Sequence, residues 1–363
     1  MFERRLIYHI DWLMIVAVGA LCAMGVAMIY STTHAGPNAG LYVRQLYAIG
    51  LGSILFMLCL AIDYRSLADN SLALYFGVLA LLVAVLLFGT TGGGAKRWIP
   101  LPFFNLQPSE FAKVTLALAL AKFFDESRRG SPSMTDLAVG GLLTVVPFLL
   151  IARQPDLGTA VTLIPIFLAI AYLAGMRLRL LGILLLVAIV AAPVAWRYAL
   201  KDYQKSRIST FIDPEQDARG AGYQQIQARI SVGSGGTWGK GYLQGTQGQL
   251  RFLPVAWNDF VFSVLAEEQG LVGVIVALGL YLFVIVRALE TARLAKDRLG
   301  AYLVLGVLAS FAFQVIYNIT MSAGLAPVKG LTLPLMSSGG SSIMATLAGF
   351  GLILNVRMRR FTN

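Results

Sequence analysis

The stretch RFLPVAWNDFVFSVLAEEQG, residues 251–270, is where a long polar segment of the chain enters an apolar helix. Asp259 lies at the boundary between the two parts. An acidic side chain at the mouth of a membrane helix is costly to desolvate, so it is a candidate functional residue. Helix capping is a second interpretation, because Asn258 or Asp259 can accept hydrogen bonds from the first amides of a helix. The stretch alone leaves both interpretations open.

The composition on either side of this stretch is that of a membrane protein. Hydrophobic residues make up 57% of the 363 positions and charged residues only 13%, which excludes an ordinary soluble domain. Apolar runs of about 17 to 25 residues can each span a bilayer. The chain is therefore expected to be an all-α integral membrane protein, with one polytopic domain over residues 1–363. Ten transmembrane helices are predicted, at residues 11–30, 41–62, 72–88, 108–124, 137–152, 157–175, 179–196, 261–286, 299–322 and 341–356.

The distribution of Lys and Arg predicts the orientation of these helices. With the N-terminus in the cytoplasm, most basic residues of the short loops fall on the cytoplasmic side. An even number of spans then returns the C-terminus to the same side. Much of the net charge of +11 is explained by this topology, so no nucleic-acid partner is indicated. The basic residues of the short outer segments are Arg44, Lys96, Arg97, Arg153 and Lys329.

One connection is far longer than packed helices need. Residues 197–260, between the seventh and eighth predicted spans, are expected to form a long extracellular loop. Its basic side chains suit an anionic lipid headgroup or a pyrophosphate, although ordinary solvation of an outer surface explains them as well. These side chains are Arg197, Lys201, Lys205, Arg207, Arg219, Arg229, Lys240 and Arg251.

Two local patterns lie within this loop. Tyr223, Ile226 and Ile230 recur at helical spacing with polar residues between them, which predicts a short amphipathic helix at the membrane interface. The run Gly233–Gly241 superficially resembles a phosphate-binding P-loop. It breaks that pattern at its first position, a serine, and again after Lys240.

Few residues are available for acid or base chemistry on the outer face. His9 is predicted to be cytoplasmic and His34 stands alone, so no histidine cluster for zinc or for base catalysis is indicated. The acid or base of any reaction there is then expected to be a carboxylate. The acidic residues predicted at outer helix ends are Glu110, Asp156, Asp259, Glu267 and Glu268.

These acidic residues differ in their surroundings. Glu110 has Lys113 three residues on, hence on the same helix face, and each would otherwise carry an unpaired charge into the membrane. The pair can be structural or can line a cavity. Glu267 and Glu268 lie two turns into their helix, so at least one must face the bundle interior. Asp259 is left as the best-placed free carboxylate.

Five motifs occur along the chain: GAKRWI (94–99), QPSEFAK (107–113), QPDLGTA (154–160), GYQQ (222–225) and GLAPVKGLTLPLMSSGGSS (324–342). Together they resemble the SEDS family, which includes RodA, FtsW and SpoVE. The similarity follows the family's order over nearly the whole chain and implies the SEDS fold, with ten spans and a large outer loop before the eighth. The compact termini are more similar to the elongation member RodA than to FtsW.

The resemblance implies a peptidoglycan glycosyltransferase that polymerises lipid II at the outer face of the bacterial cytoplasmic membrane, during cell-wall elongation and shape maintenance. In the family, the favoured catalytic residue is the aspartate of a Leu-Pro-Glu-x-His-Thr-Asp-Phe segment, which falls on Asp259. The residues at the family's glutamate, histidine and threonine are Val255, Trp257 and Asn258. Glu267 and Glu268 match the family's paired glutamates and are expected to support the structure.

For this reaction Asp259 is expected to act as general base on the acceptor 4-hydroxyl, which displaces undecaprenyl pyrophosphate with inversion. The leaving group requires cations, and Mg²⁺ or Mn²⁺ can bridge its phosphates, although no dedicated metal cage is visible. Residues 337–342 either offer amides to this anion or pack helices closely. The candidate substrate-binding residues are Lys96, Arg97, Glu110, Lys113, Arg153, Asp156, Arg207, Gln224, Ser337 and Ser338.

Two other classes of function stay open: a transporter of the same lipid-linked precursor, and a non-enzymatic scaffold for a transpeptidase. A transporter needs a polar path through the bilayer, whereas the inner halves of most predicted spans are apolar. The resemblance implies a class B penicillin-binding protein as a partner, together with other membrane proteins of the elongation complex.

Overall fold

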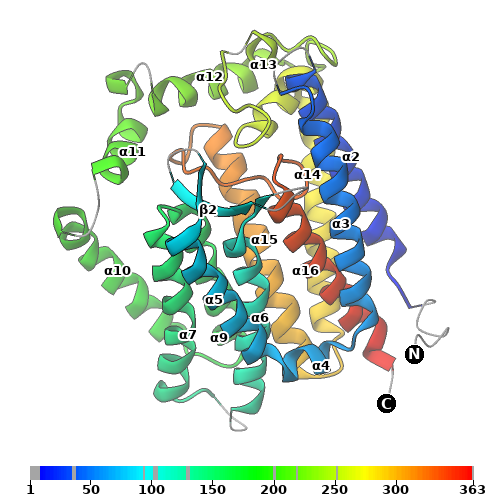
Figure 1. Cartoon of the computed structure of the whole chain (residues 1–363), viewed down its shortest axis with the longest axis vertical. Helices are drawn as coiled ribbons and strands as arrows, with labels where there is room; N and C mark the ends of the chain where they lie inside the picture. The colour runs from blue at the N-terminus through cyan, green and yellow to red at the C-terminus, as the bar shows by residue number, and fades with distance from the viewer. Residues whose placement is uncertain are drawn as a thin grey trace.

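The computed structural model describes residues 9–34, 38–92, 95–100, 105–127, 131–198, 202–217, 220–250 and 252–361. Long helices form a bundle, and shorter elements cover one end of it (Figure 1). The helices are α2 (Trp12–Thr33), α3 (Leu41–Ala61), α4 (Tyr64–Asp69), α5 (Ser71–Phe88), α6 (Pro108–Glu126), α7 (Met134–Arg153), α8 (Leu157–Val161), α9 (Leu163–Leu173), α10 (Leu178–Tyr198), α11 (Asp202–Ile212), η1 (Pro214–Asp217), α12 (Ala221–Ser234), α13 (Thr246–Gln249), α14 (Val261–Arg293), α15 (Arg298–Ser322), α16 (Gly340–Met358) and η2 (Arg359–Phe361).

Each predicted span coincides with helix in the structure, and the sixth is divided into α8 and α9. Among the described residues, seven helices are long and apolar enough to cross a membrane. This finding makes the chain a multi-pass membrane protein. The seven helices are α2, α3, α5, α7, α14, α15 and α16.

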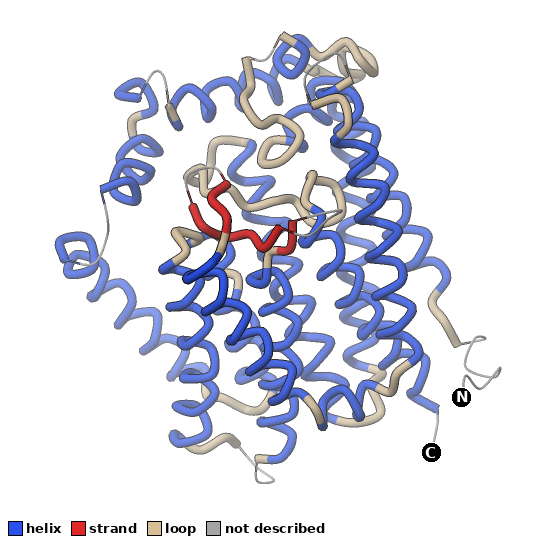
Figure 2. Tube along the Cα trace, in the orientation of Figure 1, coloured by secondary structure: helices blue, strands red, loops and turns tan. Residues whose placement is uncertain are grey.

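A small antiparallel sheet departs from the all-α expectation (Figure 2). Its strands are β1 (Thr90–Gly92), β2 (Ala95–Pro100) and β3 (Asn105–Leu106), with β2 in the middle. Ile99 pairs with Leu106 across β2 and β3. The sequence did not predict these strands because they are too short for an alternating pattern. The sheet carries Lys96 and Arg97 and leads the chain into α6.

The core is organised around α16, which is buried over almost its whole length and packs most extensively on α3. Glycines allow the two backbones to approach closely. A Cβ on Gly351 of α16 would lie 2.6 Å from the carbonyl oxygen of Phe56, and one on Gly52 of α3 would lie 2.7 Å from the side chain of Leu347. Close backbone packing therefore joins these two helices.

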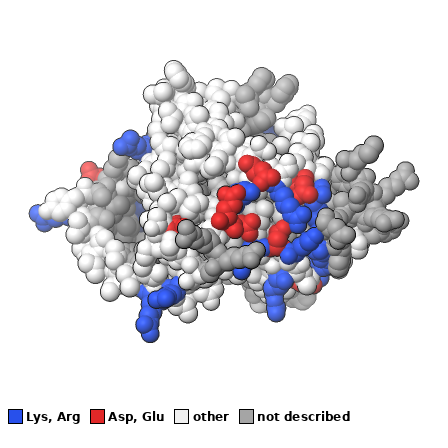
Figure 3. Space-filling model, turned by 90° about the horizontal axis from the view of Figure 1, so that it is seen from below, with Lys and Arg blue, Asp and Glu red and all other residues white. Residues whose placement is uncertain are grey.

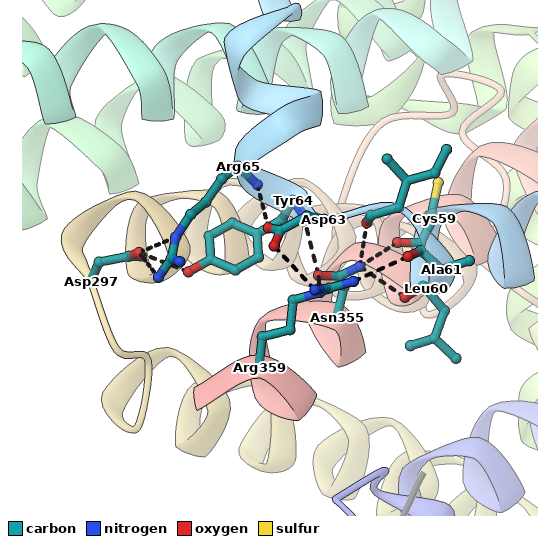
Figure 4. Close-up of polar contacts among 10 residues, drawn as sticks. Cys59, Leu60, Ala61, Asp63, Tyr64, Arg65, Asp297, Asn355 and Arg359 are labelled. Carbon is teal, nitrogen blue, oxygen red and sulfur yellow. Dashed lines mark hydrogen bonds and ion pairs between the residues drawn. The ribbon is translucent and has the colours of Figure 1, made fainter. Parts of the chain in front are cut away.

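One amide joins α3 and α16 at the end of the bundle that carries the termini (Figure 4). The Asn355 side chain donates hydrogen bonds to the carbonyls of Cys59, Leu60 and Ile62 at 2.6 to 2.9 Å. Its oxygen accepts a hydrogen bond from Arg359 Nε at 3.1 Å. Asn355 thus supplies partners for carbonyls that the end of α3 leaves without an intrahelical donor.

Charged side chains gather on the face at this end of the bundle (Figure 3). Ion pairs across it join different helices. The start of α2 and the end of α16 both lie here, opposite the segment that carries α11, α12 and α13 (Figure 1). The even number of spans and the cytoplasmic placement of both ends stay predictions. The interhelical pairs include Arg287–Asp11 and Arg65–Asp297 at 2.8 Å and Arg359–Asp63 at 3.1 Å.

The amphipathic helix predicted within the long loop is present as α12. Contact of its apolar side chains with the membrane interface stays a prediction. Gln225, Ala228 and Ser231 form the buried stripe, whereas Ile230 is 44% exposed. Ser231 Oγ donates to the carbonyl of Ser263 in α14 at 3.1 Å. Small residues occupy the buried stripe because α12 packs closely on α14.

The run Gly233–Gly241 packs against a break in α14. The helix leaves helical geometry at Gly270, where φ is 63°. The amide of Leu271, beyond the break, donates to the carbonyl of Gly236 at 2.9 Å. A Cβ on Gly270 would lie 2.2 Å from the backbone nitrogen of Gly239. Gly235 and Gly239 are therefore required for backbone contact with α14, since a Cβ on either would meet the carbonyl of Ala266 or Glu268.

Candidate active site

Asp259 lies in the turn formed by residues 254–260, directly before α14. The N-cap residue of α14 is Phe260, and no side chain makes a capping hydrogen bond. Among the described residues, Oδ1 of Asp259 and Oδ1 of Asn258 are shielded from solvent and have no hydrogen-bond partner. The capping interpretation is therefore wrong for both residues. One carboxylate oxygen of Asp259 therefore makes no hydrogen bond within the described residues.

The backbone of this turn is held by α15 and by the loop before α16. Asn318 of α15 is fully buried, and its Nδ2 donates to the carbonyls of Asp259 at 2.9 Å and Leu331 at 2.7 Å. Ser337 Oγ donates to the carbonyl of Asn258 at 2.5 Å. Asn318 was not among the predicted site residues. Its only signal in the sequence is a polar amide inside an apolar span.

Burial raises the pKa of Asp259 from 3.8 to about 6, because desolvation disfavours the carboxylate. The positive charges of Arg207 and Arg97 act in the opposite direction, and the negative charge of Asp156 adds to the rise. These three groups come from α11, β2 and the residue before α8. At neutral pH the carboxylate is mostly ionised and is a stronger base than an exposed aspartate.

Arg97 and Asp156 are fixed by their own contacts. Arg97 Nε donates to the carbonyl of Gln154 at 3.2 Å, and its guanidinium lies 3.8 Å from Asp156 Oδ1. Asp156 caps α8 by accepting from the amide of Thr159 at 3.2 Å, and it also accepts from Gln107 Nε2 at 3.0 Å. Asp156 therefore orients Arg97 beside the site. The predicted contact of Asp156 with substrate stays a prediction.

The loop between α15 and α16 passes beside Asp259 at Gly330. Gly330 has a φ of 66°, and a Cβ on it would lie 3.5 Å from Asp259 Oδ2. Lys329 precedes it, with Nζ 5.7 Å from the ring centre of Tyr317. Burial lowers the pKa of Lys329, and the charge of Arg207 lowers it further. The sequence had placed Lys329 only as an outer-loop residue, because nothing local connects it to Asp259.

Ser337 and Ser338 donate hydrogen bonds to the turn before α14. Ser337 is buried, and its Oγ accepts from the amide of Leu333 at 2.8 Å while donating to the Asp259 turn. The amide of Ser338 donates to the carbonyl of Trp257 at 2.9 Å. These contacts favour the packing interpretation of the glycine- and serine-rich run. Direct binding of an anion by these two residues stays a prediction.

Glu110 and Lys113 form the predicted pair. The Lys113 Nζ to Glu110 Oε2 distance is 2.8 Å, and both side chains are buried. Lys113 Nζ also donates to Gln314 Oε1 at 3.2 Å and lines a cavity of about 30 Å³. A cavity of this size holds a water molecule and excludes a sugar. A contact of this pair with substrate stays a prediction.

Glu267 and Glu268 are both buried, as their depth in the helix required of at least one. Glu267 accepts from Lys240 Nζ at 2.6 Å and from the amide of Thr246 at 2.8 Å. Glu268 accepts from the hydroxyl of Ser31 in α2. The two glutamates thus join Lys240, Thr246 and α2 to α14, and their supporting role stays a prediction.

The remaining predicted residues lie farther from this turn. Lys96 and Arg153 are exposed, on β2 and at the end of α7, and Gln224 is half-buried on α12. Arg207 is exposed on α11 and acts on Asp259 through its charge. Among the described residues no hydrogen bond or ion pair joins these four to Asp259. Three further basic residues of the predicted loop, Lys201, Arg219 and Arg251, lie outside the described residues.

The comparisons with known proteins identify the family. A family model described as cell cycle protein, covering FtsW, RodA and SpoVE, matches residues 5–361. The chain belongs to this family. It is the SEDS family that the five motifs indicated.

Curated SEDS relatives and a solved structure cover almost the whole chain. The peptidoglycan glycosyltransferase MrdB of Escherichia coli K12 is 37% identical over 97% of this chain and 94% of its own length. A probable peptidoglycan glycosyltransferase FtsW of Trichlorobacter lovleyi is 38% identical over 95% and 92%. A chain from a structure described as "Structural coordination of polymerization and crosslinking by a peptidoglycan synthase complex" is 34% identical, with a TM-score of 0.83 over 98% of this chain and 99% of its own.

Proposed function

We propose that the chain is a peptidoglycan glycosyltransferase that polymerises lipid II at the outer face of the bacterial cytoplasmic membrane during elongation. In this proposal the chain is one polytopic domain of ten spans, both termini are cytoplasmic, and residues 197–260 lie outside. The observation that carries it is the Asp259 carboxylate, which has an unpartnered oxygen, a pKa of about 6, and arginine charges around it. The relatives' names supply the reaction.

Asp259 would act as the general base of this transfer. Its carboxylate would accept the proton of the acceptor's 4-hydroxyl while that oxygen bonds to the donor's anomeric carbon. The bond to undecaprenyl pyrophosphate breaks on the opposite face, so the configuration inverts and the electron pair leaves with the pyrophosphate. Arg97, Arg207 and Lys329 would balance the charge of the leaving group. Asn318 and Ser337 hold the base in place.

A divalent cation, Mg²⁺ or Mn²⁺, is part of the proposal as an ion carried mainly by the substrate's phosphates. Among the described residues no group of three or more His, Cys, Asp or Glu side chains could hold a metal ion. The unpartnered oxygen of Asp259 could supply one protein ligand, and Mg²⁺ commonly binds through one or two carboxylates together with phosphates. Bound there, the ion would supply charge neutralisation.

The proposed partner is a class B penicillin-binding protein acting as the transpeptidase, with other elongation-complex membrane proteins. The structural relative described as a peptidoglycan synthase complex couples polymerization with crosslinking, and this description supports the pairing. The chain itself would supply the polymerising half of such a complex. The crosslinking half would come from the partner.

The test is polymerisation of purified lipid II by the purified full-length chain in a single detergent phase, alone and with the transpeptidase. Glycan strands longer than the disaccharide, separated on a gel, are expected, because a single phase leaves nothing to transport. A preparation that binds lipid II and forms no strands, even with the partner, would favour the transporter or the scaffold. Strands made equally well by an Asp259→Asn preparation would reveal a contaminating polymerase or a wrong base.

A further inference from the structure

A second buried amide joins α3 to the segment before α16, at the opposite end from Asn355. Gln45 of α3 is only 2% exposed. Its Nε2 donates to the carbonyl of Ser337 at 2.9 Å, and its Oε1 accepts from the amide of Gly339 at 3.3 Å. Both ends of the amide are therefore used, and both contacts lie on the segment that carries Ser337 and Ser338.

That segment leads directly to the proposed base. The hydroxyl of Ser337 donates to the carbonyl of Asn258, and the amide of Ser338 donates to the carbonyl of Trp257. One residue therefore separates the Gln45 amide from the Asp259 turn. The segment is confined on its other side as well, because a Cβ on Gly25 of α2 would lie 2.5 Å from the backbone of Met336.

We infer that Gln45 is a positioning residue for glycosyl transfer: it holds residues 337–339 against α3 and thereby sets the place of the Asp259 carboxylate. Asn318 holds the Asp259 carbonyl from α15, so the turn is held from two sides. This inference rests on the proposed role of Asp259 as base. Gln45 touches neither the carboxylate nor the reacting atoms.

Removal of the Gln45 amide leaves the Ser337 carbonyl and the Gly339 amide without their partner, and buried polar groups without partners relax toward new ones. Displacement of a catalytic group by about 1 Å can lower turnover by about 100-fold. Looser packing also admits water to Asp259. Hydration would relieve the desolvation that is the largest cause of the raised pKa of Asp259, so that pKa would fall toward its ordinary value.

The test compares Gln45→Met with Asn355→Leu in purified full-length protein, because each variant removes one buried amide between α3 and α16 and keeps a similar volume. Only the first of these amides contacts the segment beside Asp259. Gln45→Met is expected to lower kcat roughly 10- to 100-fold with KM nearly unchanged, and to move the acid limb of kcat/KM to lower pH. Asn355→Leu is expected to lower the melting temperature while kcat per folded molecule stays near wild type.

Equal kcat losses in the two variants, or a Gln45→Met loss that only follows the folded fraction, would overturn the inference. Gln45→Leu removes the same two hydrogen bonds with a branched side chain, so its kcat should fall as that of Gln45→Met does. It serves as the test where Gln45→Met does not fold, and wild-type kcat in Gln45→Leu would then overturn the inference. Asp259→Asn is measured alongside, since full activity in that variant removes the proposed base whatever Gln45 does.

Discussion

Asp259→Asn is expected to make the protein more stable at neutral pH while it removes the base. The pKa of Asp259 is about 6 in the fold, against 3.8 for a free aspartate. A rise of about two pH units corresponds to about 3 kcal/mol, which is an upper value because the residue as a whole is only partly buried. The folded state binds the proton more tightly than the unfolded state. The stability that Asp259 contributes is therefore fully present below pH 3.8 and is lost as the pH rises through about 6.

The assay is thermal unfolding of the purified full-length protein in detergent at pH 7.5 and at pH 5. Asparagine is neutral at both values, so the variant should melt several degrees above wild type at pH 7.5, and this advantage should shrink at pH 5. The matched control is Asp202→Asn, the same chemical change at an exposed position in α11, which should alter stability by no more than about 0.5 kcal/mol. If Asp259→Asn melts below wild type at both pH values, the carboxylate is a structural anchor and the reasoning is refuted.

Three further predictions concern the surroundings of the base. Glu110→Ala and Lys113→Ala should each destabilise the fold by about 3 to 5 kcal/mol, because each change leaves the other buried charge without its partner. The double variant should lose less than the sum of the two, and strictly additive losses in thermal unfolding would show that the pair is not coupled. The kcat/KM of wild type should fall tenfold per pH unit below about 6 as Asp259 is protonated, and a profile that stays flat to pH 4.5 would contradict this. Arg97→Ala should move that acid limb to higher pH because it removes a charge that lowers the pKa of Asp259, whereas Lys96→Ala on the same strand should leave the limb in place.

The transmembrane helices could be predicted because each is an uninterrupted apolar run, and the run alone determines the helix. The Glu110–Lys113 pair could be predicted for a similar reason, since residues three apart share a helix face. The strands around Arg97 could not, because two to six residues carry no usable period. The side of α12 that packs on α14 could not be predicted, because close packing there selects small residues such as Ala228 and not apolar size.

The site was only partly predictable. Asp259 could be found because its acidic side chain stands at a helix mouth and matches the family segment. Asn318 and Gln45 could not be assigned, because each acts on the Asp259 turn, directly or through residues 337–339, from a helix far away in the sequence. Their hydrogen bonds depend on how the helices pack, and no local pattern encodes that packing. The sequence therefore indicated the proposed base and Ser337 beside it, and missed Asn318 and Gln45.

The central claim, that Asp259 is the base of glycan polymerisation, is tested most directly by the turnover of Asp259→Asn. Purified wild type, Asp259→Asn and Asp202→Asn are given lipid II at saturating concentration and pH 7.5, and initial rates are expressed per folded molecule. The account predicts that Asp259→Asn loses about two to four orders of magnitude in kcat, the usual scale of general-base catalysis, while Asp202→Asn keeps the wild-type rate. Near-wild-type turnover by folded Asp259→Asn would contradict the account.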